Sequence, residues 1–147
     1  MSASLLDVNV LVALLDSEHV HHRSARDWFE AQGRAGWATC PIVENGFVRI
    51  VSTRRYPGTT LSPGEASELL AALKGRYHQT HRWWPDDVSL TDETLFRMEV
   101  LLGANQVTDA YLLGLAFRKG GRVASFDRSL PWQVVRGASQ KLVEKIR

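Results

Sequence analysis

The stretch that decides the fold is SLLDVNVLVALL, residues 4–15, an apolar run in which only Ser4, Asp7 and Asn9 are polar. Its first part, residues 4–10, is rich in Leu and Val, which is typical of a short strand that is covered on both faces. Burial of an unpaired carboxylate costs more free energy than the neighbouring apolar side chains recover. We therefore expect Asp7 to lie where the strand leaves the core and to serve a site there.

Length and composition indicate one soluble globular domain that spans residues 1–147. The chain is 44% hydrophobic and 23% charged, with a formal net charge of +2, which is ordinary for a globular domain and only weakly suggests a polyanionic partner. Its single cysteine, Cys40, excludes an internal disulfide and a CxxC metal site. No basic leader precedes the first apolar run and no segment reaches the ~20 apolar residues of a membrane helix. A cytoplasmic protein with no membrane contact is expected.

The rest of the chain alternates between short apolar segments and longer segments with helical periodicity. Strands are predicted at residues 36–40, 81–84 and 122–127. Helices are predicted over 10–33 with a break near Asp16, over 41–54, over 62–76 with Ser62 as N-cap, over 91–103, and over 108–121. Such alternation favours βαβ units, so we expect a three-layer α/β/α fold around a central parallel sheet of short strands.

Four acids fall at positions that this topology brings to one edge. Asp7 and Asp127 lie near the carboxyl ends of two predicted strands, and Glu44 and Asp109 lie in the first turns of two helices that begin at that edge. Two carboxylates about 4 Å apart repel by about 4 kcal/mol at an effective dielectric constant of 20, so a cation is required between them. Oxygen ligands without His or Cys favour Mg²⁺ or Mn²⁺, which can activate water against a phosphodiester.

The same segments resemble a known family. LLDVNVLVAL, PIVENGFVRI, QVTDAYLLGLA and ASFDRSL are similar to the four acidic motifs of PIN domains, and DSEHVHHRSARDWFE and WWPDDVSL resemble segments of the VapC-type toxins of bacterial toxin–antitoxin pairs. The resemblance implies a Mg²⁺- or Mn²⁺-dependent endoribonuclease that is dimeric and is neutralised by a small VapB-type antitoxin. It also implies that Asp7, Glu44, Asp109 and Asp127 are the metal-binding and catalytic acids, with Asn9 and Thr108 as supporting polar groups.

Two other functions stay open at this point. One is a non-catalytic module that binds RNA or a structural metal. The other is a phosphohydrolase of the haloacid-dehalogenase type, because LLDVNVLV partly resembles its D-x-D strand end, although Asn9 replaces the second Asp. Each single acid also has a structural interpretation, since Asp7 is a good helix cap and Asp109 suits a helix N-terminus.

Several other polar and aromatic residues could contribute to a site. The HVHH segment, residues 19–22, lacks the i, i+4 spacing of a helical metal-binding pair, so we expect it to be structural. Trp83 and Trp84 could stack on RNA bases, but a core position for one and a dimer contact for the other is the more frequent outcome. The arginines at positions 54, 55 and 128 are candidates for phosphate contacts and fit a solvated surface equally well.

Overall fold

A central parallel sheet organises the molecule. The computed structural model describes residues 2–147, and within them five strands form one sheet in the order β3-β2-β1-β4-β5, with every neighbouring pair parallel. The strands are β1 (Ser4–Leu6), β2 (Trp37–Thr39), β3 (His81–Trp83), β4 (Arg122–Ser125) and β5 (Val143–Lys145). All five carboxyl ends therefore meet at one edge, as the sequence predicts for the first four strands; β5 was not predicted.

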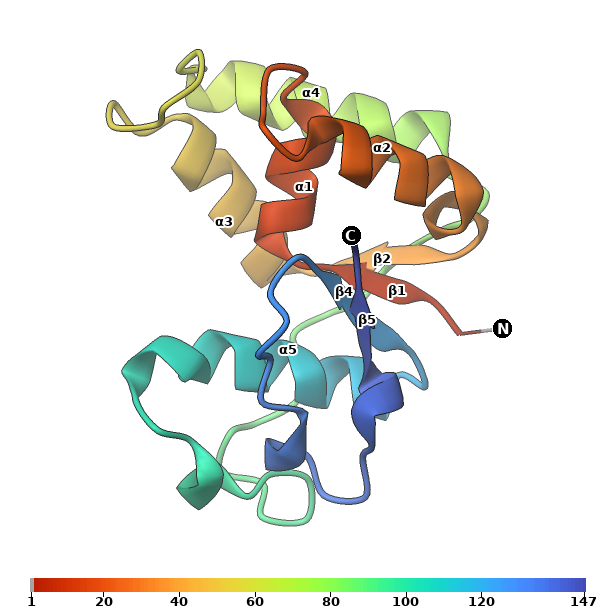
Figure 1. Cartoon of the computed structure of the whole chain (residues 1–147), viewed down its shortest axis with the longest axis vertical. Helices are drawn as coiled ribbons and strands as arrows, with labels where there is room; N and C mark the ends of the chain where they lie inside the picture. Colours follow the sequence, from red (N-terminus) through yellow and green to blue (C-terminus); the bar gives the residue numbers. More distant parts are fainter. Residues whose placement is uncertain (1) are drawn as a thin grey trace.

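Helices cover both faces of this sheet. One face carries α1 (Val8–Leu15), α2 (His22–Ala31), α3 (Pro41–Val51) and α4 (Pro63–Arg76), and the other carries α5 (Val107–Arg118) (Figure 1). Short 3-10 turns occupy Gly33–Ala35, Met98–Val100, Ala104–Gln106, Trp132–Val134 and Gln140–Leu142. The predicted α/β/α architecture is confirmed. No helix within residues 2–147 is long and apolar enough to cross a membrane.

The opening segment corrects the prediction of a strand over residues 4–10. The strand ends at Leu6, and Asp7 adopts an extended conformation in which its carboxylate accepts a hydrogen bond from the Val8 N–H at 2.8 Å, so that α1 begins at Val8. The helix is buried from Val10 to Ala13. A helix that is apolar on all sides is a buried helix, and in so short an apolar run periodicity cannot separate it from a buried strand.

The predicted helix over residues 91–103 is also wrong, and the reason is a long-range contact. The Arg97 N–H donates to the Val134 carbonyl at 2.7 Å, and the Leu95 carbonyl accepts from the Arg136 N–H at 2.9 Å. The segment thus pairs its backbone with the C-terminal part of the chain, leaving only the 3-10 turn at Met98–Val100. By contrast, α4 begins as predicted, with a complete capping box between Ser62 and Glu65.

The strand order also fixes where a ligand can bind. The chain passes from β1 to β2 through helices on one face, whereas α5, on the other face, leads into β4 on the opposite side of β1 (Figure 1). The sheet therefore changes winding direction between β1 and β4. In open parallel α/β sheets, the carboxyl ends of the strands at such a switch point form the ligand-binding crevice.

Candidate active site at the carboxyl edge of the sheet

Asp7 is a buried carboxylate at the switch point. Its side chain follows β1, its residue exposure is 9%, and its second oxygen accepts a hydrogen bond from the Ser125 hydroxyl at 2.7 Å. Burial raises the pKa of Asp7 and outweighs the lowering effect of the hydrogen bonds from Ser125 and Val8, and the charge of Asp127 raises it further. Asp7 therefore has two roles. It caps α1, and it places a poorly compensated negative charge at the carboxyl edge of the sheet.

Ser125, the last residue of β4, connects the polar groups around Asp7. Its hydroxyl oxygen accepts hydrogen bonds from the Asn9 side-chain amide at 3.2 Å and from the Asp127 N–H at 3.0 Å. The same hydroxyl donates a hydrogen bond to Asp7. Asn9 is therefore a neighbour of the site, as predicted. Sequence analysis did not single out Ser125, although a small hydroxyl residue two positions before Asp127 at a strand end was the available signal.

Asp109 completes the group. It lies in the first turn of α5, and its pKa is raised to about 6, first by burial and then by the negative charges of Asp7 and Asp127. The charged side chains that shift its pKa are thus both acids. We call Asp7, Asp109 and Asp127 the aspartate cluster. Electrostatic repulsion within it is relieved either by a proton or by a cation.

Glu44, the fourth predicted acid, is directed elsewhere. Its carboxylate accepts a hydrogen bond from the Thr39 hydroxyl at 2.7 Å and forms an ion pair with Lys74 of α4 at 2.8 Å. The Thr39 oxygen is also 2.7 Å from His81 Nε2, and the pKa of His81 is lowered to about 4, mainly by burial and then by the charge of Lys74. The structure brings three of the four predicted acids together and places Glu44 in a separate cluster beside α4.

The donor atoms of the aspartate cluster suit a hard divalent cation, although their arrangement is not a complete preformed site. Its donors are carboxylate oxygens, which Mg²⁺ and Mn²⁺ prefer. Within residues 2–147, however, no three His, Cys, Asp or Glu side chains lie close enough together to form a ready cage. Mg²⁺ usually keeps several water ligands and takes one or two carboxylates from the protein, so an incomplete set of this kind suits it.

The other residues considered from the sequence lie outside this cluster. The His22 ring nitrogen lies 2.8 Å from the Ala13 carbonyl, and the His21 ring stacks on Phe126 at a centroid distance of 5.0 Å, so these histidines are structural. Trp84 is buried, whereas Trp83 is 51% exposed. Arg54, Arg55 and Arg128 are exposed, as a solvated surface requires.

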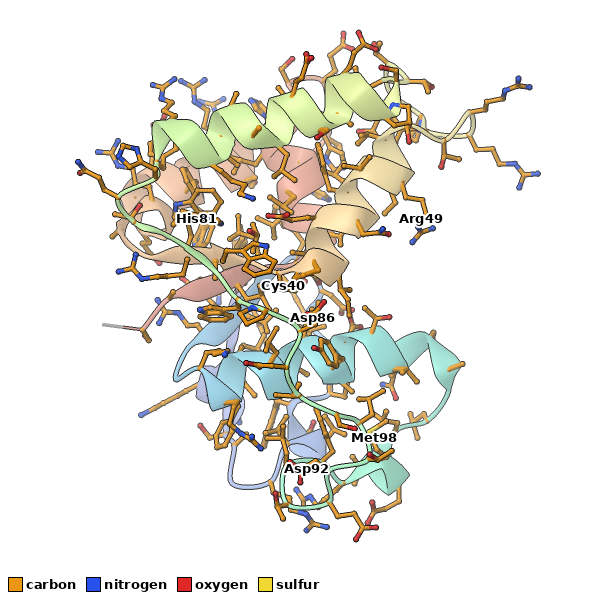
Figure 2. All side chains as sticks on the ribbon, turned by 180° about the vertical axis from the view of Figure 1, so that it is seen from behind. Cys40, Arg49, His81, Asp86, Asp92 and Met98 are labelled. Atoms are coloured by element: carbon orange, nitrogen blue, oxygen red, sulfur yellow. The ribbon has the colours of Figure 1, made fainter. Side chains whose placement is uncertain are left out.

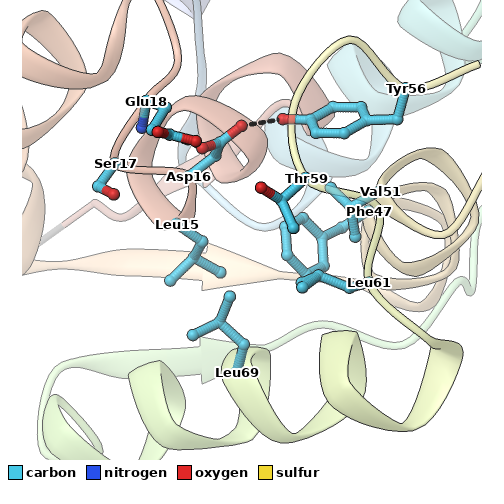
Figure 3. Close-up of a pocket in the computed structure, with 10 residues that line it drawn as sticks. All are labelled: Leu15, Asp16, Ser17, Glu18, Phe47, Val51, Tyr56, Thr59, Leu61 and Leu69. Carbon is cyan, nitrogen blue, oxygen red and sulfur yellow. Dashed lines mark hydrogen bonds between the residues drawn. The ribbon is translucent and has the colours of Figure 1, made fainter.

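A separate cavity of about 180 Å³ lies between the end of α1, α3, α4 and the loop before α4 (Figure 3). Its walls are mostly apolar, with Phe47, Leu61 and Leu69 prominent, and the Tyr56 hydroxyl donates a hydrogen bond to Asp16 at its rim. None of the four predicted acids lines it. It is therefore distinct from the crevice at the sheet edge.

The family model of the PIN domain matches residues 4–132. The chain belongs to the PIN-domain family. Ribonuclease VapC44 of Mycobacterium tuberculosis is 46% identical over 139 residues, which cover 94% of this chain and 95% of that protein. Ribonuclease VapC38 of the same organism is 44% identical over 124 residues, or 84% of each chain. This PIN domain is thus of the VapC type.

A solved structure supports the fold of this PIN domain. The crystal structure of M. tuberculosis VapC20, a toxin that cleaves the sarcin–ricin loop, aligns with a TM-score of 0.59 over 89% of this chain and 93% of that one. The sequence identity is 14%, so the likeness concerns the fold. It agrees with a parallel sheet that is covered by helices on both faces.

Proposed function

We propose that this PIN-domain protein is a metal-dependent endoribonuclease, the toxin of a toxin–antitoxin pair. The observation that carries the proposal is the aspartate cluster, in which burial and mutual repulsion raise the pKa values of Asp7 and Asp109. Its place at the switch point of a parallel sheet is where a substrate would bind. Relatives that match along nearly the whole chain are named ribonucleases.

The proposed metal ligands are Asp7, Asp109 and Asp127, and the ion is Mg²⁺ or Mn²⁺. When bound, such an ion lowers the pKa of a water ligand and stabilises the charge that develops on a phosphodiester. Ser125 holds one oxygen of Asp7, and the Val8 N–H holds the other, so that the carboxylate keeps one orientation. In the proposed reaction the water oxygen bonds to phosphorus and the water gives up one proton, while the bond from phosphorus to the leaving ribose oxygen breaks and that oxygen takes up one proton, so that it departs as a hydroxyl.

The role of Glu44 is a distinct part of the proposal. The family resemblance makes it a metal ligand, but in the structure its carboxylate is held by Lys74 and Thr39. We propose that Glu44 supports the site by joining α3 to α4 and β2. Thr108, next to Asp109 at the start of α5, remains a proposed supporting polar group.

The proposed partners are an RNA substrate, a VapB-type antitoxin and a second copy of this chain, in the cytoplasm. The relatives support the antitoxin and the RNA, because they are VapC ribonucleases by name and align over most of their length. Co-purification with the product of an adjacent short reading frame tests the antitoxin. Sedimentation of the purified chain tests the dimer.

The decisive experiment compares the wild type with Asp7→Asn in cells and in vitro. New RNA 5′ ends are mapped across the transcriptome after induction, and the purified proteins are then assayed on the mapped RNA with EDTA, Mg²⁺ or Mn²⁺. Metal-dependent cleavage by the wild type alone supports the proposal. Tight RNA binding without products under any metal would instead indicate a non-catalytic binding module.

A further inference from the structure

The side of α3 that faces the start of α1 carries no acid. Gly46 marks this side, because a Cβ atom added there would lie 2.9 Å from a Val8 methyl group. Each helical residue turns by about 100°, so Glu44 lies about 200° around the axis from Gly46, whereas Ile42 and Arg49 lie near it. Glu44 therefore lies on the side of α3 that is turned away from α1. Arg49 lies nearer to the side that faces α1, about 60° around the helix axis from Gly46.

A groove runs along this side of α3 and opens beside the aspartate cluster. The groove, which we call the α3–α5 groove, has a volume of about 370 Å³, and its lining includes Val8, Asn45, Arg49, Ile50, Asp86 and Thr108. Val8 directly follows Asp7, and Thr108 directly precedes Asp109. The lining of the groove thus includes the immediate neighbours of two proposed metal ligands.

The charges in the groove are separated. Asp86, an exposed lining residue, contributes to the raised pKa values of Tyr111 and of buried Cys40, although burial is the larger cause for both. Arg49 is exposed, and none of the ion pairs among residues 2–147 includes it. Figure 2 shows Arg49 projecting from α3 toward solvent, with Asp86 nearer to Cys40. The guanidinium is therefore free to bind an external anion.

We infer that the α3–α5 groove binds the single-stranded RNA next to the scissile phosphate, with Arg49 on a neighbouring phosphate. The inference rests on the proposed ribonuclease function and adds a substrate subsite to it. An arginine binds phosphate with two parallel hydrogen bonds, and its charge survives at any physiological pH. Exposed Asn45 supplies amide donors and acceptors for a base or a ribose, and half-exposed Ile50 supplies an apolar surface beside it.

The test measures RNA affinity as a function of salt concentration. The probe is a fluorescein-labelled 20-nucleotide RNA of random sequence, and all variants carry Asp7→Asn so that the probe stays intact in Mg²⁺. Arg49→Ala should weaken binding about fivefold and lower the slope of log K against log salt by about 0.7, the value for one phosphate contact on a single strand. Arg49→Lys should keep the slope and lose less affinity.

The matched control is Arg34→Ala, since Arg34 is also exposed but precedes β2 at the opposite edge of the sheet. Arg34→Ala should change neither affinity nor slope. Circular dichroism of each variant monitors folding, which an exposed arginine should not affect. An Arg49→Ala protein that matches Arg34→Ala in both measurements overturns the subsite.

The outcomes separate the subsite from the proposed function. If the wild type cleaves RNA but Arg49→Ala leaves affinity unchanged, the subsite is wrong and the ribonuclease stands. If RNA binds through Arg49 but no metal supports cleavage, the proposed ribonuclease is wrong, and the groove is an RNA-binding surface with no scissile phosphate beside it. If the Asp7→Asn protein does not bind RNA at low salt, or if Arg49→Ala weakens only the binding of a protein partner, the subsite is rejected.

Discussion

The aspartate cluster and the glutamates show two ways in which this fold holds buried and partly buried carboxylates. Glu144 of β5 accepts hydrogen bonds from Ser4, Trp28 and Arg122 at 2.7, 2.8 and 2.9 Å. Burial raises the pKa of Glu144, but these hydrogen bonds together outweigh it, so the net shift is downward. Glu44 has Lys74 as its cation. Asp7 and Asp109 have raised pKa values, and the charges that act on them are acids.

The difference in charged partners separates acids that connect structural elements from acids that are suited to bind a ligand. Glu144 forms an ion pair with Arg122, and Glu44 forms an ion pair with Lys74. Each glutamate therefore has a cationic partner within the chain. Among residues 2–147, no lysine or arginine forms an ion pair with a member of the aspartate cluster. Perturbed carboxylates in a crevice are the ones that indicate a functional site.

The strongest way to break this comparison is to remove one charge from the aspartate cluster. Asp7→Asn keeps a good helix cap and removes a buried charge, so we expect RNA cleavage to fall by at least about 100-fold while the melting temperature stays level or rises. Single-turnover cleavage and thermal unfolding measure the two effects. Retained cleavage would contradict the assignment of Asp7.

Removal of the hydroxyl that holds Asp7 should have a smaller effect. In Ser125→Ala, Asp7 loses the 2.7 Å hydrogen bond that lowers its pKa. Its pKa should rise further, so we expect cleavage at neutral pH to fall about tenfold, with partial recovery at higher pH. A pH–rate profile checks this prediction. Ser139→Ala is the control, because the Ser139 hydroxyl accepts a hydrogen bond from the Lys141 N–H and contacts none of the acids.

Glu44→Gln tests the other side of the comparison. The amide can still accept from Thr39, but Lys74 loses its partner, so we expect a loss of about 1 kcal/mol in the free energy of unfolding and only a few-fold loss of cleavage. The double variant with Lys74→Gln should be less destabilised than the sum of the single variants. A loss of cleavage as large as that of Asp7→Asn would instead make Glu44 a member of the metal site.

The smallest predicted effect is a pH dependence of stability in metal-free protein. The folded pKa of Asp109, about 6, lies above its ordinary value of 3.8, so its ionisation weakens the fold as pH rises from about 4 to above 6. His81 acts in the opposite direction in this window, because its folded pKa of about 4 lies below 6.5. Because His81 is the same in the wild type and in an Asp109 variant, the difference between the two proteins isolates the contribution of Asp109.

The measurement is the melting temperature of Asp109→Asn minus that of the wild type, in EDTA. This difference should grow from pH 4 to pH 7, and Mg²⁺ should reduce it at pH 7 by stabilising the wild type. A difference that is flat with pH would show that Asp109 ionises without cost in the fold. Asp92→Asn is a suitable control, because the pKa of Asp92 is lowered by Thr94 and Arg118.

The sequence by itself determined the architecture and most of the candidate site. Local signals are sufficient for α4, where Ser62 and Glu65 form the capping box that their spacing predicts. They are also sufficient for the aspartate cluster, because parallel strands end at one edge whatever the details of packing. Asp7, Asp109 and Asp127 could therefore be placed together before any contact was known.

Only the tertiary structure decided which way each side chain turns. The contact of Gly46 with Val8 sets the rotation of α3, and this rotation directs Glu44 to Lys74 and Arg49 to the groove. Likewise, the backbone of residues 95–97 pairs with residues 134–136 and prevents the helix that its own sequence favours. These outcomes depend on partners distant in the chain, and local periodicity and capping carry no information about such partners.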